Sequence, residues 1–215
     1  MKEKMHFSEV FPAGAKTVPE LRMAARIWCK HNKNIPIAEF EGLVTECIRN
    51  PAALRKCMGG ILLDYMPKQR AMINPVIFEN WLEYTIGWGE VDAVCYGHFT
   101  ADEILDDFKN WKLLIEKLSQ SNNINKRRGA IVLLTKPLKQ SGDKRLSHLG
   151  FWITDTLKHE KSILITKAIS WLLRNLIKFH RKEVESFLKA NKGLLPKIAV
   201  RETMNKLETG RKDGV

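Results

Sequence analysis

Apolar residues recur along the chain in steps of three and four, which is the spacing of one face of an α-helix. After Val18, for example, Leu21, Ala25 and Trp28 follow this spacing. No stretch of five or more residues alternates between apolar and polar positions, so we expect an all-α fold. The pattern predicts helices over residues 18–30, 36–49, 54–66, 75–86, a shorter one from about 88, and then 100–118, 125–138, 144–157, 162–179, 181–190 and 196–207.

The predicted helices are short and closely linked, with no long heptad run. This arrangement favours antiparallel helix pairs that stack side by side into an α-α superhelix, or solenoid. No clear repeat is visible in the sequence, so a compact irregular bundle remains an alternative. We expect one helical domain over residues 1–215, irregular over residues 1–17 and loose after about residue 208.

Composition indicates a folded protein without a membrane span. Hydrophobic residues make up 44% and charged residues 28% of the chain. No apolar stretch approaches the roughly 20 residues that cross a bilayer, and the first ten residues lack the apolar run of a signal peptide. The four cysteines have no metal-like spacing and are expected as buried thiols, so we expect a soluble, cytoplasmic protein.

Positive charge is concentrated in the second half of the chain. Residues 1–110 contain 13 Lys and Arg against 15 Asp and Glu, whereas residues 111–215 contain 23 against 9. Such a basic surface attracts a polyanion, most commonly DNA or RNA. A solvated basic face without a partner, or one that meets anionic lipid, is the alternative.

The helix predicted over residues 162–179 has an unusual basic face. At about 100° per residue, Lys167, Trp171, Arg174 and Lys178 fall within roughly 60° of one another, opposite a broad apolar arc. An aromatic ring among cations suits contact with a nucleotide whose phosphates the cations hold. Packing of Trp171 against a neighbouring helix, with Arg174 stacked on it, is equally compatible with the pattern.

Two further motifs are candidates for chemistry or binding. Trp88 and Asp92 are four residues apart and share a helical face, where the carboxylate could stabilise a positive charge or orient a water. An aspartate near a helix N-terminus also stabilises the helix dipole, which is the simpler explanation. The cations Lys126, Arg127 and Arg128 open another predicted helix, where they oppose its dipole, so phosphate contact is favoured over a buried salt bridge.

The sequence contains no P-loop, GxGxxG or HExxH motif, and its six histidines fit no ligand spacing. We therefore expect no metal and no other cofactor.

Three segments together resemble the AlkD-type DNA alkylation repair glycosylases, and the similarity extends from residue 18 to the last predicted helix. The segments are WGEVD (88–92), KRRGAIV (126–132) and KAISWLLR (167–174). The resemblance implies a superhelix of HEAT-like helix pairs and a monofunctional glycosylase of base excision repair. Such an enzyme hydrolyses the N-glycosidic bond of cationic N3- or N7-alkylated purines in duplex DNA.

The resemblance also assigns roles to individual residues. Asp92 would stabilise the sugar cation and the attacking water, Trp88 and Trp171 would flank the deoxyribose, and Arg128 would contact the DNA backbone. The expected partner is damaged duplex DNA, bound by a monomer without an obligate protein partner. The alternative function is a non-catalytic helical-repeat scaffold that binds DNA or RNA, and a scaffold for an acidic protein is a third possibility.

Overall fold

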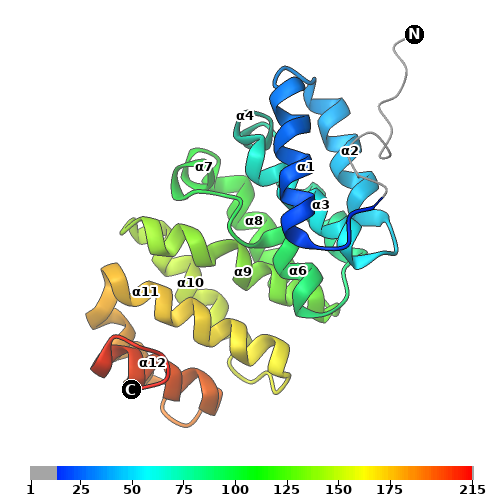
Figure 1. Ribbon diagram of the computed structural model, residues 1–215. Helices are drawn as coiled ribbons and strands as arrows, with labels where there is room; N and C mark the ends of the chain where they lie inside the picture. Colours follow the sequence, from blue (N-terminus) through cyan, green and yellow to red (C-terminus); the bar gives the residue numbers. More distant parts are fainter. Residues whose placement is uncertain (1–13, 215) are drawn as a thin grey trace. The chain divides into compact units, whose positions relative to one another are not determined.

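The computed structural model describes residues 14–214 and confirms the all-α fold class. Helices make up about 75% of this part of the chain, and residues 14–214 contain no strand (Figure 1). The helices of the described residues are α1 Val18–His31, α2 Ile37–Arg49, α3 Ala53–Tyr65, α4 Pro67–Ala71, α5 Ile77–Glu83, α6 Gly87–Cys95, α7 Ala101–Asp106, α8 Phe108–Ser119, α9 Ile124–Gln140, α10 Lys144–Leu157, α11 Ile163–Ala190 and α12 Lys197–Thr209.

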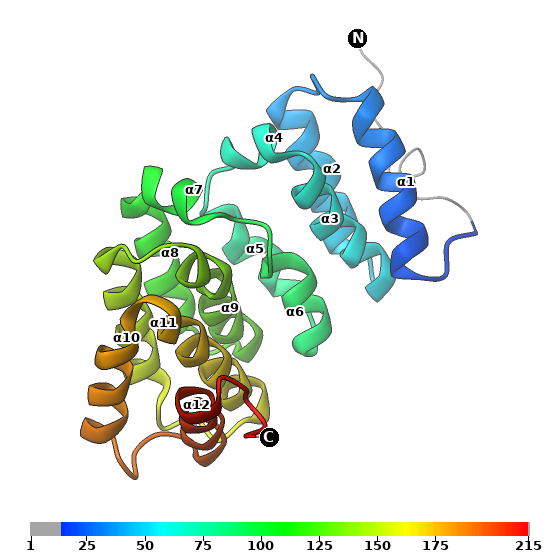
Figure 2. The same cartoon turned by 60° about the vertical axis from the view of Figure 1, so that its left-hand side comes forward.

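The chain divides into two compact units, each with its own core. Unit 1 ends at His98 and contains α1 to α6, and unit 2 begins at Phe99 and contains α7 to α12. In unit 1, α3 packs against α1, α2 and α6; in unit 2, α9 packs against α8, α10 and α11, and α11 packs against α12 (Figure 2). Neighbouring helices thus pack in pairs, as expected of a helical repeat. The single domain stays a prediction.

Within unit 1, α3 and α6 approach each other closely at one glycine. A Cβ atom on Gly60 would lie 1.8 Å from the carbonyl oxygen of Ala93, so no larger residue fits at position 60 without moving a helix. The start of α1 is fixed by a capping box in which Thr17 and Glu20 bond each other's backbone N–H groups.

Several helix boundaries differ from the sequence prediction. The helix expected over residues 100–118 is two helices, because Asp107 leaves the helical conformation (φ −122°, ψ 43°) and its carboxylate accepts hydrogen bonds from Asn110. The helix expected over residues 75–86 spans only Ile77–Glu83, and α4 was not predicted. By contrast, α11 breaks at His180 (φ −129°, ψ 40°), where the prediction divided it.

Predictions were also made for the two chain ends and the cysteines, and those for the chain ends stay predictions. Residues 1–13 lie outside the described residues, and residues 14–17 precede α1. The C-terminal segment turns back at Gly210, and the side-chain amide of Asn205 donates to the Lys212 carbonyl at 3.0 Å. Cys29, Cys47 and Cys95 are buried thiols as expected, whereas Cys57 is only partly buried.

Burial raises the pKa of the Cys29 thiol to about 12, so this thiol is unreactive near neutral pH. None of the helices in residues 14–214 meets the length and apolarity that a membrane crossing requires. The same residues contain no group of three His, Cys, Asp or Glu that could hold a metal ion.

Candidate functional site

Trp88 and Asp92 lie one turn apart on α6 of unit 1, as their spacing predicted. The helix begins at Gly87, whose positive φ of 71° makes the sharp turn into α6. The Trp88 side chain is 65% exposed, which is high for an indole, and Asp92 is half-buried. The arrangement presents an aromatic ring and a carboxylate on one helical face.

A buried ion pair anchors the first turn of α6 to α3. The Lys56 ammonium lies 2.6 Å from the Glu90 carboxylate, and both side chains are largely removed from solvent. The same Glu90 oxygen accepts the backbone N–H of Ile86 at 2.8 Å, which caps the helix start. Glu90 lies between Trp88 and Asp92 in sequence, so this contact fixes the turn that carries both residues.

His98 anchors the other end of α6. Its Nδ1 lies 2.8 Å from the Asp64 carboxylate and its Nε2 lies 2.7 Å from the Ala93 carbonyl. His98 therefore links α3 to the end of α6 through both of its ring nitrogens.

The carboxylate of Asp64 is held in its charged form by this contact. Burial alone would raise the pKa of Asp64, but the hydrogen bond and charge of His98, together with Arg22 at 3.4 Å, hold the pKa below its ordinary value. This ion-pair network joins α1, α3 and α6 and was not apparent in the sequence.

The basic face predicted on α11 divides into exposed and paired residues. Lys167 and Lys178 are exposed, and Trp171 is half-buried. The Lys178 ammonium donates to the Lys139 carbonyl at 3.1 Å and lies 4.6 Å from the centre of the Phe179 ring. The ammonium groups of Lys167 and Lys178 remain accessible to an anion.

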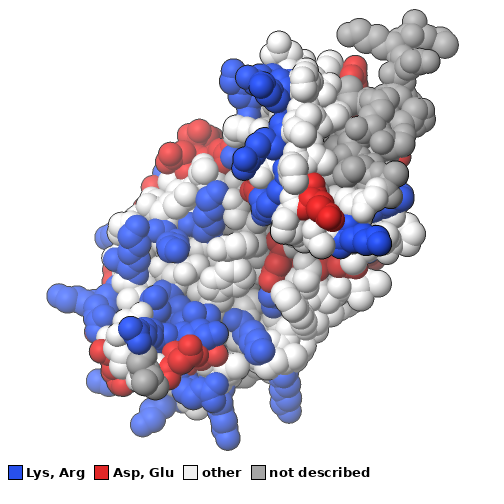
Figure 3. Space-filling view, in the orientation of Figure 1, with Lys and Arg blue, Asp and Glu red and all other residues white. Residues whose placement is uncertain are grey.

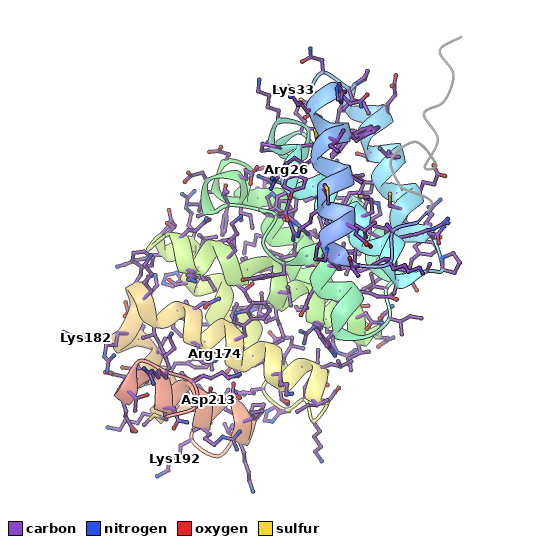
Figure 4. The ribbon with its side chains drawn as sticks, viewed as in Figure 1. Arg26, Lys33, Arg174, Lys182, Lys192 and Asp213 are labelled. Carbon is purple, nitrogen blue, oxygen red and sulfur yellow. The ribbon has the colours of Figure 1, made fainter. Side chains whose placement is uncertain are left out.

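Arg174 is instead placed between α11 and α12. Its Nε donates to the backbone carbonyl of Ser170, and its guanidinium lies 3.6 Å from Glu202 of α12. Figure 4 shows Arg174 on the α12 side of α11, near Asp213. Burial lowers the pKa of Arg174 below its ordinary value, although the Glu202 and Asp213 carboxylates act to raise it.

The cations at the start of α9 also make internal contacts. Arg128 is 5% exposed and donates to the Leu164 carbonyl of α11 at 2.5 Å. Arg127 lies 2.6 Å from the Glu160 carboxylate, so the salt bridge considered as an alternative is present at this residue. Lys126 is half-buried. Contact of Arg127 and Arg128 with phosphates stays a prediction. In the structure both side chains bond to other parts of the protein.

The predicted site residues thus fall into two groups. Trp88 and Asp92 belong to unit 1, whereas Trp171 and the predicted DNA-binding cations Lys126, Arg127, Arg128, Lys167, Arg174 and Lys178 belong to unit 2. Within unit 2, the hydrogen bond from Arg128 brings the start of α9 to the first turn of α11. That Trp88 and Trp171 flank one deoxyribose stays a prediction.

The concentration of positive charge is visible on the surface of unit 2. Residues 99–215 contain 24 Lys and Arg against 13 Asp and Glu, and Figure 3 shows Lys and Arg gathered over α11 and α12. A second set of cations, on α1 and α4 of unit 1, was missed. Its sequence signal was present, because Arg22, Arg26 and Lys30 recur every four residues.

Comparison with known proteins identifies one family. The family model described as "DNA alkylation repair enzyme" matches residues 2–207, which is nearly the whole chain. None of the curated proteins matches the sequence.

Proposed function

The chain belongs to the DNA alkylation repair enzyme family, and we propose that within this family it is a monofunctional DNA glycosylase. Its proposed substrates are cationic N3- and N7-alkylated purines in duplex DNA, which it removes as the first step of base excision repair. The observation that carries the proposal is the exposed Trp88 ring one turn from the half-buried Asp92 carboxylate on α6.

The reaction requires stabilisation of positive charge more than protonation of the leaving group. When the bond between C1′ and the alkylated base breaks, its electron pair moves to the base, which leaves as a neutral molecule. Positive charge then develops on the deoxyribose, and the Asp92 carboxylate stabilises it. A water oxygen bonds to C1′, and the proton that it loses passes to Asp92 or to solvent.

The aromatic residues and cations complete the proposed site. The electron-rich faces of Trp88 and Trp171 would flank the deoxyribose and stabilise its charge. The exposed ammonium groups of Lys167 and Lys178 would bind phosphates, and Lys126 and Arg128 would contribute to the field that attracts DNA. Arg127 and Arg174 would contribute less to this field, because Glu160 and Glu202 offset their charge. The two ion-pair contacts that anchor α6 support the mechanism, since a rigid helix holds a carboxylate in position for a short-lived cation.

The proposal is tested by measuring the release of 7-methylguanine and 3-methyladenine from methylated duplex DNA. Asp92→Asn removes the charge but keeps the shape, so we expect excision to fall at least about 100-fold, with the Kd for DNA within about twofold of wild type. Asp106→Asn, at an exposed carboxylate of α7, is the matched control and should excise normally.

Normal excision by Asp92→Asn would disprove the role of this carboxylate. Salt-sensitive binding of duplex DNA without any release by the wild type would instead indicate the non-catalytic DNA-binding function.

A further inference from the structure

A groove in unit 1 lies between the end of α1, the loop that follows it, and the start of α4. Its volume is 360 Å³. It is lined by four cations together with Tyr65 and mainly apolar atoms, and none of its lining residues is acidic. The cations are Arg26, Lys30, Lys33 and Lys68, and Figure 4 shows Arg26 and Lys33 at this edge of α1.

The positive charge of this groove is not cancelled within the described residues. Among residues 14–214, no carboxylate pairs with Arg26, Lys30, Lys33 or Lys68, and the contact of Arg26 is with the Tyr65 ring at 5.7 Å. Unit 1 as a whole is nearly neutral, with 12 Lys and Arg against 11 Asp and Glu. A third of its cations therefore lie in one groove. A bound anion would offset the repulsion between these like charges.

The walls of the groove are fixed by buried hydrogen bonds. Gln69 of α4 is 5% exposed, and its amide donates to the Lys33 carbonyl at 2.8 Å and to the Ile35 carbonyl at 3.4 Å. Arg70 is also buried and donates to the Leu63 carbonyl at 2.8 Å. Because Gln69 ties α4 to the loop after α1 and Arg70 ties α4 to the end of α3, the groove is formed before any ligand arrives.

We propose that this groove binds consecutive phosphates of the DNA backbone on one side of the lesion. The proposal rests on the proposed function, which supplies the DNA. Four cations exceed the charge of about −1.5 to −2 on a single phosphomonoester, whereas neighbouring phosphates of one strand offer one charge each. A strand of DNA therefore matches the groove better than a small phosphate ester does.

The position of the groove on unit 1 sets its distance from the proposed catalytic carboxylate. Lys56, at one end of α3, contacts the turn that carries Trp88 and Asp92, and Tyr65, at the other end, lines the groove. Tyr65 follows Lys56 by nine residues, which is a rise of roughly 14 Å along the helix axis. For a strand that runs along α3, at about 3.4 Å per nucleotide, this rise corresponds to about four nucleotides between the lesion and the groove.

The test measures the salt dependence of binding to duplex DNA for Lys30→Gln/Lys33→Gln. Both side chains are exposed, so folding should be unaffected, and an unchanged Tm checks this. We expect the slope of log Kd against log salt concentration to become shallower by about one to two units, since each lost phosphate contact contributes about 0.9. The matched control, Lys16→Gln/Lys109→Gln, removes the same charge from exposed positions outside the groove and should keep the wild-type slope.

A second measurement locates the contact along the DNA. On the side of the lesion that faces the groove, a duplex that ends two to four base pairs away should bind wild type as weakly as it binds the groove variant. Shortening the duplex on the opposite side should weaken binding of both proteins equally. An unchanged slope in the groove variant, or an equal change in the control, would overturn the proposal. A different combination of results would also overturn it. In that case a free mononucleotide raises the Tm of the wild type but not of the groove variant, and the salt slope of DNA binding is the same for both proteins.

These results can be separated from the proposed function. If the wild type excises bases but the salt slope of its DNA binding does not depend on Lys30 and Lys33, only the groove proposal is wrong. DNA binding that depends on the groove, without excision, removes the glycosylase proposal and supports the groove.

Discussion

The two units use their charged residues differently. Residues 1–98 contain almost equal numbers of cations and anions, and unit 1 buries two carboxylate contacts, Lys56 with Glu90 and His98 with Asp64. Residues 99–215 have nearly twice as many cations as anions. In unit 2, Arg128 donates to the Leu164 carbonyl and Lys178 to the Lys139 carbonyl, whereas Arg127, Arg174 and Arg181 pair with carboxylates.

The difference has an electrostatic consequence. A carboxylate partner satisfies the donor and also cancels its charge, whereas a carbonyl satisfies the donor and leaves the net charge in place. Arg128 and Lys178 can therefore fix helices of unit 2 and still keep their share of the positive field that attracts a polyanion. In unit 1 the buried Lys56 charge is balanced by Glu90, and four cations without a carboxylate partner among residues 14–214 gather in the groove beside α1.

The largest effect should come from Gly60→Ala, which tests the packing of α3 against α6 in unit 1. The added methyl group would overlap the Ala93 carbonyl, so we expect a loss of about 3 kcal/mol in the free energy of unfolding and weaker excision, because α6 carries Asp92. Urea denaturation measures the first and base release the second. Gly42→Ala, with no atom within 4 Å of its new Cβ, should be neutral or slightly stabilising. Equal stability of the two variants would contradict the close approach of the helices.

A smaller effect is expected from Arg128→Ala, which tests the use of carbonyl partners in unit 2. Loss of this buried side chain should cost about 2 kcal/mol of unfolding free energy and flatten the salt dependence of DNA binding by about one unit. Urea denaturation and DNA titrations at several salt concentrations measure the two effects.

Lys167→Gln is the comparison for Arg128→Ala, because Lys167 is exposed on the same proposed DNA-binding face. It should flatten the slope similarly and leave stability unchanged. An Arg128→Ala protein with wild-type stability would show that Arg128 has no packing role.

The smallest effect concerns pH and compares carboxylates of the two units. The folded-state pKa of Asp64 is depressed, so its stabilisation is fully present above the ordinary aspartate pKa of about 3.9 and is lost as pH falls through the folded value. We expect wild type to lose about 1 kcal/mol more unfolding free energy than Asp64→Asn between pH 5 and pH 3, measured by urea denaturation.

Asp143 of unit 2 provides the control, because its pKa is lowered by the exposed Arg145. High salt should screen the Asp143 contribution and leave that of the partly buried Asp64 largely intact. Equal screening at both residues would mean that the Asp64 contact is open to solvent.

Local features of the fold could be predicted from the sequence because they depend on neighbouring residues. The division of α11 at His180 and the start of a helix near residue 100 were predicted from the sequence. The break at Asp107 was not found, because apolar spacing continues across it although the backbone of Asp107 leaves the helical conformation. The face shared by Trp88 and Asp92 follows from helical spacing alone.

The sequence by itself determined the all-α class, the excess of positive charge after residue 110 and the candidate chemistry on α6 and α11. Tertiary structure alone decided which cations are accessible. Lys56 and Glu90, like Asp64 and His98, are 34 residues apart and meet only because α3 packs against α6. Helical periodicity states which face of a helix is apolar, but it does not state which helix covers that face. For that reason Arg128 and Lys167, both predicted to bind phosphate, differ in the structure: one is buried against a carbonyl and the other is exposed to solvent.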